Sequence, residues 1–258
     1  MPKIIISGIC GKMGTSILNL CPQDKEIEVV AGIEASGHQM IGKKIQPLDI
    51  PVESDLEKVI DKTDVLIEFT NPDATFEHVK IAEKYKKACV IGTTGLSEEQ
   101  VSYIKKASQK IPIVFSPNMS IGVNLLFKLV EQVSNILKDY DIEIVEAHHN
   151  KKKDAPSGTA LKLLEKIKSA RQTKLKEIYG REGQIGARKP DEIGVFAVRA
   201  GDIVGEHTVI FGGTGERIEL VHRAHSRDTF AKGALTAAKW IINKKSGLYD
   251  MGDVLNLK

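Results

Sequence analysis

The stretch KIIISGICGKMG, Lys3 to Gly14, indicates the fold of the first half of the chain. A short β-branched run that ends at Gly8 is typical of a buried parallel strand. Gly8, Gly11 and Gly14 then precede a predicted helix, and glycines in that context let backbone approach a pyrophosphate at the helix N-terminus. The spacing G-x-x-G-x-x-G is one residue off the usual dinucleotide motif, so a glycine-rich turn without a ligand is the alternative.

An acid and two loops support the dinucleotide site. Glu34 ends the next predicted strand, about twenty residues after the glycines, where a ribose-binding acid belongs. The loops FTNP, Phe69 to Pro72, and GTTG, Gly92 to Gly95, also follow predicted strands. Ligands of open α/β sheets bind at the carboxyl ends of strands. We therefore expect both loops to line one crevice, although each is also compatible with an ordinary turn.

Strands and helices alternate through the first half of the chain. The strand-like runs span residues 3–8, 27–34, 64–70, 88–95 and 111–118. Amphipathic segments at 73–87 and 97–110 separate the later runs, with acidic starts, basic ends and Ser97 as an expected N-cap. This alternation predicts an α/β fold with a Rossmann-type doubly wound parallel sheet.

The pattern changes after residue 119. Residues 124–140 predict a long amphipathic helix, whose apolar stripe comprises Leu125, Leu126, Leu129, Val130, Val133, Ile136 and Leu137. A strand at 141–149, a helix at 157–171 and three strands within 195–225, expected to be antiparallel, follow. Residues 228–245 predict a helix that packs back on the first half. We therefore predict a dinucleotide-binding domain of residues 1–119 plus 228–258, and a second α+β domain on a mixed sheet, residues 120–227.

Composition narrows the classes of function. The 258 residues carry a formal net charge of only +3, which gives no case for a nucleic-acid surface. The start MPKIIISGIC lacks the pattern of a signal peptide, and no apolar run is long enough for a membrane span. Cys10, Cys21 and Cys89 have no metal-ligand or C-x-x-C spacing and are interpreted as reduced thiols. We expect a cytoplasmic protein with no membrane or nucleic-acid partner.

The stretch EAHHNKKKDAPSGTA, Glu146 to Ala160, concentrates polar chemistry. Adjacent strand histidines point to opposite faces, so His148 and His149 do not predict a shared metal, and no metal site is expected. Ser157 to Thr159 begin a predicted helix whose N–H groups favour an anion, with lysines just upstream. Histidines that carry protons beside an anion site, next to a dinucleotide domain, suggest reduction of a small anionic substrate.

These residues resemble a known family. The stretch EAHHNKKKDAPSGTA is similar to the signature of the 4-hydroxy-tetrahydrodipicolinate reductases, also called dihydrodipicolinate reductases, of the diaminopimelate–lysine pathway. GxxGxMG, GTTG, SPNMSIGVN, VRAGDIVGEHTVIF and HSRDTFAKGA resemble the same family in the same order. The resemblance implies hydride transfer from NADH or NADPH to the ring of a cyclic imine dicarboxylate. It also implies a homotetramer whose substrate domains associate through their sheets.

The resemblance also implies roles for individual residues. His148 is the expected proton donor, and Lys152 is the other candidate acid. The expected substrate-binding residues are His149, Ser157, Gly158, Thr159, Thr94 and Arg227. The expected coenzyme-binding residues are Gly8, Gly11, Lys12, Met13, Gly14, Glu34, Phe69, Thr70, Gly92, Thr94, Ser116, Asn118 and Met119.

Two alternatives and the choice of coenzyme remain open from sequence. A Rossmann-type amino-acid dehydrogenase shares the first domain but has no evident need for the central stretch. A non-catalytic dinucleotide sensor needs no proton donor beside an anion site. Ala35 follows Glu34 where some family members carry an arginine for the phosphate of NADPH, whereas Lys12 offers a partial substitute. We therefore expect both coenzymes to be used, with NADH equal or better.

Overall fold

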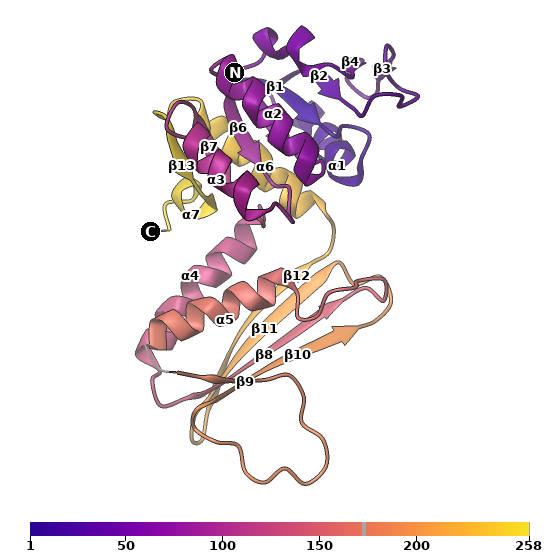
Figure 1. Ribbon diagram of the computed structural model, residues 1–258. Helices are drawn as coiled ribbons and strands as arrows, with labels where there is room; N and C mark the ends of the chain where they lie inside the picture. Colours follow the sequence, from indigo (N-terminus) through magenta and orange to yellow (C-terminus); the bar gives the residue numbers. More distant parts are fainter. Residues whose placement is uncertain (172–173, 258) are drawn as a thin grey trace. The chain divides into compact units, whose positions relative to one another are not determined.

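The computed structural model describes residues 1–171 and 174–257 (Figure 1). The chain divides into two compact units. Unit 1 comprises Met1–Ile121 with Arg227–Lys258, and unit 2 comprises Gly122–Ser226. The C-terminal helix therefore belongs to the same unit as the glycine loop. Within the described residues, no helix is both long and apolar enough to cross a membrane.

Unit 1 is built on an eight-stranded sheet in the order β13-β7-β6-β5-β1-β2-β4-β3. All neighbouring pairs are parallel except β3 and β4. The order runs outward in both directions from β1 and β5, which is the switch point of a doubly wound sheet. The strands are β1 (Lys3–Ser7), β2 (Glu28–Ile33), β3 (Lys44–Ile45), β4 (Ile50–Glu53), β5 (Val65–Glu68), β6 (Ala88–Ile91), β7 (Pro112–Phe115) and β13 (Gly247–Tyr249).

Helices cover both faces of this sheet (Figure 1). Alternate residues of β1 enter opposite cores: Ile4 and Ile6 pack with α1 (Lys12–Leu20) and α6 (Asp228–Ile241), and Ile5 packs with α2 (Pro72–Lys84) and α3 (Glu98–Ala107). Each such buried side chain contributes about 1.5–3 kcal/mol. Short helical segments complete the unit: η1 (Cys21–Gln23), η2 (Leu56–Lys58), η3 (Ile60–Lys62) and α7 (Met251–Val254).

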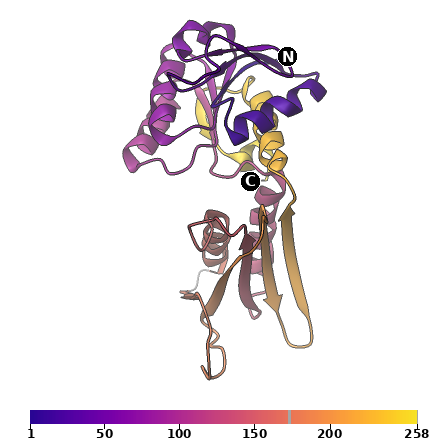
Figure 2. The ribbon, with the colours of Figure 1, turned by 90° about the vertical axis from the view of Figure 1, so that its right-hand side faces the viewer.

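Unit 2 has a five-stranded mixed sheet in the order β12-β11-β8-β10-β9. The strands are β8 (Asp141–His148), β9 (Lys176–Ile178), β10 (Glu192–Arg199), β11 (Gly205–Gly212) and β12 (Arg217–Ala224). β11 and β12 form a long antiparallel hairpin, which Figure 2 shows clearly. Helices α4 (Ile121–Ile136) and α5 (Gly158–Arg171) pack on one face, around a core that includes Ile144, Val209 and Phe211.

The fold class predicted from sequence is confirmed, and so is the N-cap of α3. Ser97 accepts from the backbone N–H of Gln100, whose side chain accepts from the N–H of Ser97. The antiparallel arrangement expected for the strands within 195–225 holds for β11 and β12, which pair with each other. β10 is not their neighbour in the sheet: it pairs in parallel with β8, which lies between β10 and β11. A periodic pattern in one segment does not determine its neighbour across the sheet, because that neighbour is separate in sequence.

The predicted apolar stripe of α4 is also only partly correct. Leu126 and Val130 are buried in the core of unit 2, whereas Leu125, Leu129 and Ile136 are exposed. The helix is apolar over a wider arc than one packing contact covers, so its sequence does not identify the buried side. The short strands β3, β4, β9 and β13 were not predicted, because two to four residues carry little periodicity.

Candidate functional site

The glycine loop requires glycine for steric reasons. Gly8 has a φ of +71°, and a Cβ there would lie 3.0 Å from the carbonyl oxygen of Phe69. A Cβ at Gly14 would lie 2.1 Å from the carbonyl oxygen of Gly8. Gly11 is the N-cap of α1, where no side chain of the described residues caps the helix and the first turn holds no acid. The N-terminus of α1 is thus suited to an anion held by backbone N–H groups.

Glu34 lies against this loop. It follows β2, and its Oε1 accepts a hydrogen bond of 2.7 Å from the N–H of Cys10. The N–H of Gly8 in turn donates to the carbonyl of Ile33 at 2.8 Å. Burial, with a smaller contribution from Glu34, raises the pKa of the Cys10 thiol, so Cys10 stays protonated. The acid and the glycines therefore occupy one edge of the sheet, and the geometry fits a dinucleotide.

The two further loops reach the same edge. Gly92 follows β6, and a Cβ there would come within 2.1 Å of the Phe69 ring that follows β5. Thr70 packs its methyl group beside Gly8. Thr93 is buried, whereas Thr94 is exposed. Phe69, Thr70, Gly92 and Gly8 are thus brought together.

The remaining coenzyme candidates differ in accessibility. Lys12 is exposed in the first turn of α1, and Met13 beside it is half-buried. Met119 is buried, and a Cβ on Gly233 of α6 would lie 1.7 Å from its carbonyl oxygen. The hydroxyl of Ser116 donates to the carbonyl of Asn118 at 2.9 Å. Ser116, Asn118 and Met119 therefore stabilise the turn after β7, and their contact with coenzyme stays a prediction.

In unit 2, a buried carboxylate organises the polar side chains. Glu146 of β8 is fully buried, and its Oε2 lies 2.6 Å from Nδ1 of His148, two residues along the same strand. Arg199 of β10 binds both carboxylate oxygens at 2.8 Å. The N–H of Ser157 donates to Oε1 at 3.0 Å. Burial alone raises the pKa of Glu146, but these hydrogen bonds outweigh it and hold the pKa below its ordinary value.

This arrangement fixes His148. Because Glu146 is held as a carboxylate, Nδ1 of His148 donates to it, and Nε2 is the nitrogen left for chemistry. Nε2 lies beside Gly205, where a Cβ would be 3.1 Å away, so glycine keeps that side of the ring accessible. Burial lowers the pKa of His148, and the neighbouring Glu146 offsets part of this effect.

His207 is a third member of the cluster. It lies opposite Glu146 across the β8–β11 ladder, and its ring packs edge-on against His148 with centroids 5.3 Å apart. Its Nε2 is 3.0 Å from the hydroxyl of Ser157, which also accepts from the N–H of Ala160. Burial, followed by the charge of His148, lowers the pKa of His207 to about 3, so it is neutral.

The contacts of Ser157 bear on its predicted role. Its N–H is engaged by Glu146 and its hydroxyl by His207 and Ala160. The first turn of α5 therefore presents an exposed Gly158 and a half-buried Thr159 beyond a Ser157 that is buried. Direct contact between Ser157 and substrate stays a prediction.

Of the three lysines, Lys151 and Lys153 are exposed and Lys152 is half-buried. Nζ of Lys152 lies 2.9 Å from a carboxylate oxygen of Asp154.

Three further residues, His149, Thr94 and Arg227, are expected to bind substrate. His149 has a buried Nδ1 without a hydrogen-bond partner among the described residues. Thr94 and Arg227 belong to unit 1, and their part in a substrate pocket stays a prediction.

Sequence reasoning missed Glu146, Arg199 and His207 as site residues. Glu146 carried a signal, since alternate residues of a strand share a face and His148 is two positions away. Arg199 and His207 reach the cluster through sheet pairing, which the sequence did not reveal. Among residues 1–171 and 174–257, no group of three or more His, Cys, Asp or Glu side chains has an arrangement that could hold a metal ion.

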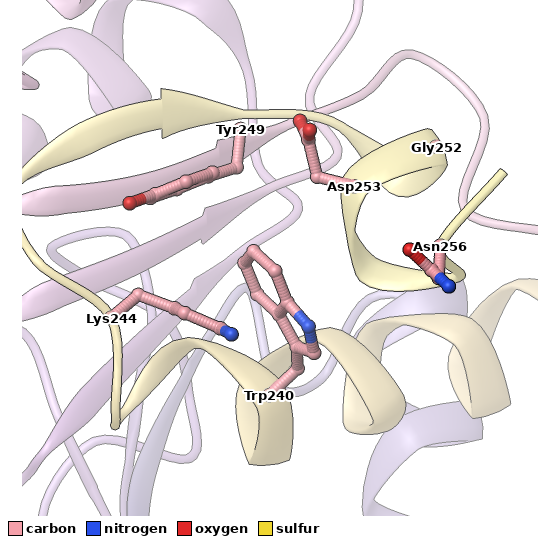
Figure 3. Close-up of a pocket in the computed structure, with 6 residues that line it drawn as sticks. All are labelled: Trp240, Lys244, Tyr249, Gly252, Asp253 and Asn256. Carbon is pink, nitrogen blue, oxygen red and sulfur yellow. The ribbon is translucent and has the colours of Figure 1, made fainter. Parts of the chain in front are cut away.

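Two surface cavities lie in unit 1. Figure 3 shows one of about 520 Å³, where Trp240 of α6 and Tyr249 of β13 meet beside Lys244, Asp253 and Asn256. β13 is the edge strand of the sheet, four strands away from β1. The other, of about 650 Å³, is lined by residues that include Asn71, Pro72, Gly95 and Ser97. It extends the edge formed by the FTNP and GTTG loops.

The fold and these residues define a class: oxidoreductases with a Rossmann-type unit and a second unit on a mixed sheet. Comparison with known proteins makes the assignment specific. Family models match residues 2–119 as dihydrodipicolinate reductase, N-terminus, and residues 122–255 as dihydrodipicolinate reductase, C-terminus. The chain belongs to the dihydrodipicolinate reductase family, as its motifs predicted, and is an NAD(P)H-dependent oxidoreductase.

Individual relatives agree over their full lengths. The chain is 51% identical to the 4-hydroxy-tetrahydrodipicolinate reductase of Desulfotalea psychrophila, covering 100% of this chain and 99% of the relative. It is 50% identical to that of Aquifex aeolicus, covering 99% of each. A solved structure, a dipicolinate-bound dihydrodipicolinate reductase from Paenisporosarcina sp. TG-14, matches with a TM-score of 0.81 at 27% identity over 97% of each chain.

Proposed function

We propose that this chain reduces 4-hydroxy-tetrahydrodipicolinate to tetrahydrodipicolinate in lysine and diaminopimelate biosynthesis. The overall change takes up one hydride and one proton and releases one water. NADH or NADPH supplies the hydride when bound. The observation that carries the proposal is the anchoring of His148 by the buried Glu146–Arg199 pair, which leaves Nε2 of a fixed imidazole for proton delivery.

The two units divide the work in this proposal. Unit 1 holds the coenzyme through Gly8, Gly11 and Gly14, with Glu34 on the ribose. Lys12, Met13, Phe69, Thr70, Gly92, Thr94, Ser116, Asn118 and Met119 complete that set. Unit 2 holds the dicarboxylate at the N-terminus of α5, where helix N–H groups and Lys152 favour negative charge.

Proton delivery follows from the electrostatics of His148. In the free protein, burial favours the neutral ring. A doubly negative substrate favours the protonated ring, so substrate binding and protonation of His148 promote each other. Glu146 stabilises the imidazolium and fixes its orientation. Lys152 binds a substrate carboxylate and is the alternative proton donor.

The assembly and location are also proposals. We infer a homotetramer that associates through unit 2, supported by exposed apolar residues on β10, β12 and α4: Val198, Ile218, Val221, Leu125 and Leu129. Light scattering on the purified protein tests this, and a monomer at micromolar concentration would contradict it. A cytoplasmic location is supported by the free thiols of Cys10, Cys21 and Cys89.

The deciding assay follows coenzyme oxidation at 340 nm with freshly generated 4-hydroxy-tetrahydrodipicolinate. We expect turnover with this substrate and none with amino acids plus oxidised coenzyme. Amino-acid oxidation in its place would favour the amino-acid dehydrogenase. Tight coenzyme binding without turnover on either substrate would favour the non-catalytic sensor.

A further inference from the structure

Glu68, the last residue of β5, is a fully buried carboxylate that the proposed mechanism does not use. Its neighbours in the sheet are Ser7 of β1 and Ile91 of β6, so it lies beneath the edge where the predicted coenzyme loops begin. A buried carboxylate is costly unless hydrogen bonds or a cation compensate it. The hydrogen-bond partners of Glu68 therefore indicate which parts of unit 1 it connects.

Two side chains bind the carboxylate directly. Oε2 lies 2.8 Å from Nδ1 of His78 in α2, and Nδ1 is also 3.0 Å from the hydroxyl of Ser7. Oε1 accepts a short hydrogen bond from the hydroxyl of Thr70. Glu68 thus connects β1, helix α2 and the loop after β5.

A chain of hydroxyl groups extends this connection to the loop after β6. The hydroxyl of Thr75 donates to that of Thr93 at 2.8 Å, and Thr93 donates to the carbonyl of Glu68 at 3.5 Å. The oxygen of Thr93 also accepts the N–H of Thr70 at 3.2 Å. The hydroxyl of Thr70 also lies 3.3 Å from the carbonyl oxygen of Asn71 and 3.3 Å from the hydroxyl of Thr75. Glu68 thus accepts from the hydroxyl of Thr70 on its carboxylate and from that of Thr93 on its carbonyl.

The side chains of Glu68, Thr75 and Thr93 are buried and do not reach a ligand themselves. Their effect on ligand binding is therefore indirect, through the loops to which they are hydrogen-bonded. Thr93 joins the backbone of Thr70 to the GTTG loop, where Thr94 is exposed. Phe69, next to Glu68, packs against Gly92. The network therefore sets the spacing of the FTNP and GTTG loops.

We propose that Glu68 is a positioning residue for the coenzyme, acting with His78, Thr70, Thr75 and Thr93 to hold the FTNP and GTTG loops in their binding geometry. This inference rests on the proposed coenzyme site. Loops fixed before binding need not be ordered when the ligand arrives, so loss of the network weakens coenzyme affinity. Substrate affinity at saturating coenzyme should change less than coenzyme affinity, because most of the expected substrate-binding residues lie in unit 2.

The test compares buried threonines. Thr75→Val removes the hydroxyl with little change of shape, and Thr75→Ser retains it. Thr63→Val is the matched control: Thr63 is also buried, and its hydroxyl donates to the carbonyls of Lys3 and Val65, at the opposite end of β5 from the loops. Glu68→Gln keeps the shape of the carboxylate but removes its charge. NADH affinity is measured by calorimetry, and stability by thermal unfolding of the same samples.

We expect Thr75→Val to weaken NADH binding about 3- to 10-fold, and Glu68→Gln more than about tenfold, in the range of one or two lost hydrogen bonds. Thr75→Ser and Thr63→Val should bind NADH as the unmodified protein does, although Thr63→Val is destabilised. Equal affinity in Thr75→Val and Thr63→Val would overturn the inference. If Glu68→Gln does not fold, the threonine variants decide. Absence of NADH and NADPH binding in the unmodified protein would overturn the proposed function itself.

Discussion

Each unit contains a fully buried glutamate bonded to Nδ1 of a histidine, and the two pairs differ in their other partners. Glu146 has Arg199 on both oxygens and the N–H of Ser157. Glu68 has a threonine hydroxyl, and among the described residues its one salt-bridge partner is His78. A bidentate arginine keeps a carboxylate ionised and its histidine oriented. The threonine hydroxyls around Glu68 instead connect it to the loops that follow β5 and β6.

The difference teaches that burial and a histidine partner do not by themselves define a catalytic acid. His148 lies at the end of β8 with its Nε2 beside Gly205. His78 lies within α2, whose neighbouring side chains Thr75 and Val79 are buried. The first pair orients a ring at the end of β8, whereas the second connects helix α2 to the end of β5. The predictions below test this contrast.

The largest effect is expected at His148. His148→Gln removes the proton donor, and a positioned general acid contributes about 10²- to 10⁴-fold to turnover. We expect kcat to fall by that factor while NADH affinity is unchanged. His78→Gln is the control from the other pair and should alter NADH affinity more than kcat. An unchanged kcat in His148→Gln would transfer the proton-donor role to Lys152 or to water.

Removing Arg199 tests how much each buried glutamate depends on its charged partner for the stability of the fold. Arg199→Met leaves Glu146 buried without its cation, which costs about 3 kcal/mol of unfolding free energy. The pKa of Glu146 is held low in the folded state, so its stabilising contribution is present at neutral pH and is lost as the pH falls. The difference between variant and unmodified protein should therefore narrow in acid, because protonation relieves the unpaired charge.

Thermal unfolding at several pH values from 7 down to below 4.5, the ordinary pKa of glutamate, measures this effect. His78→Gln should cost less, about 1 kcal/mol, because glutamine still donates to Glu68. If His78→Gln lost more unfolding free energy than Arg199→Met, the Glu68–His78 pair and not the Glu146–Arg199 pair would be the one that depends on a fully paired charge.

Binding of a substrate mimic tests the expected charged contacts of the two carboxylates. Pyridine-2,6-dicarboxylate should compete with substrate, and Lys152→Ala and Arg227→Ala should each weaken it by about 1.5–3 kcal/mol through loss of a charge-assisted contact. Lys152 lies in unit 2 and Arg227 in unit 1, and the two variants test the expected contribution of each charge to dicarboxylate binding. If both variants bind the mimic as well as the unmodified protein does, the expected roles of Lys152 and Arg227 are wrong.

The pH dependence of kcat/KM reports on the Glu146–His148 contact. Activity requires protonated His148, so kcat/KM should fall as the pH rises through its pKa. Burial lowers that pKa and Glu146 partly restores it. Glu146→Gln should therefore move the falling limb to lower pH and reduce kcat/KM at a fixed pH above it. A limb that does not move would show that Glu146 does not act through His148.

The two pairs also show what the sequence predicted and what it did not. Gly8 and Gly14 identified their loop because the chain needs glycine there for reasons that are local: a positive φ and contacts under 3 Å. His148 was predicted instead from the resemblance of its motif to a known family. Glu68 and Glu146 were not recognised as anchors, because a strand glutamate is more often exposed.

Longer-range contacts explain the remaining omissions. Arg199 and His207 reach Glu146 through strand pairings with segments fifty or more residues away. Those pairings depend on the order of strands in the sheet, which the sequence analysis did not predict. Motifs thus predicted roles for His148 and Lys152, whereas the residues that hold His148 in place became visible only in the folded chain.

The smallest expected effect concerns the choice of coenzyme at Glu34. Its carboxylate accepts from the N–H of Cys10, which holds it against the glycine loop. There we expect it to accept hydrogen bonds from ribose hydroxyls and to repel a 2′-phosphate. Lys12 is exposed on α1, and its flexible point charge compensates only partly. We expect both coenzymes to work, with NADH equal or better in kcat/KM. Ala35→Arg should shift the ratio toward NADPH about tenfold, equal to about 1.4 kcal/mol. Steady-state kinetics with each coenzyme measures the ratio, with Ala35→Gln as the uncharged control. A strong preference for NADPH in the unmodified protein would show that Lys12, and not Glu34, dominates the ribose site.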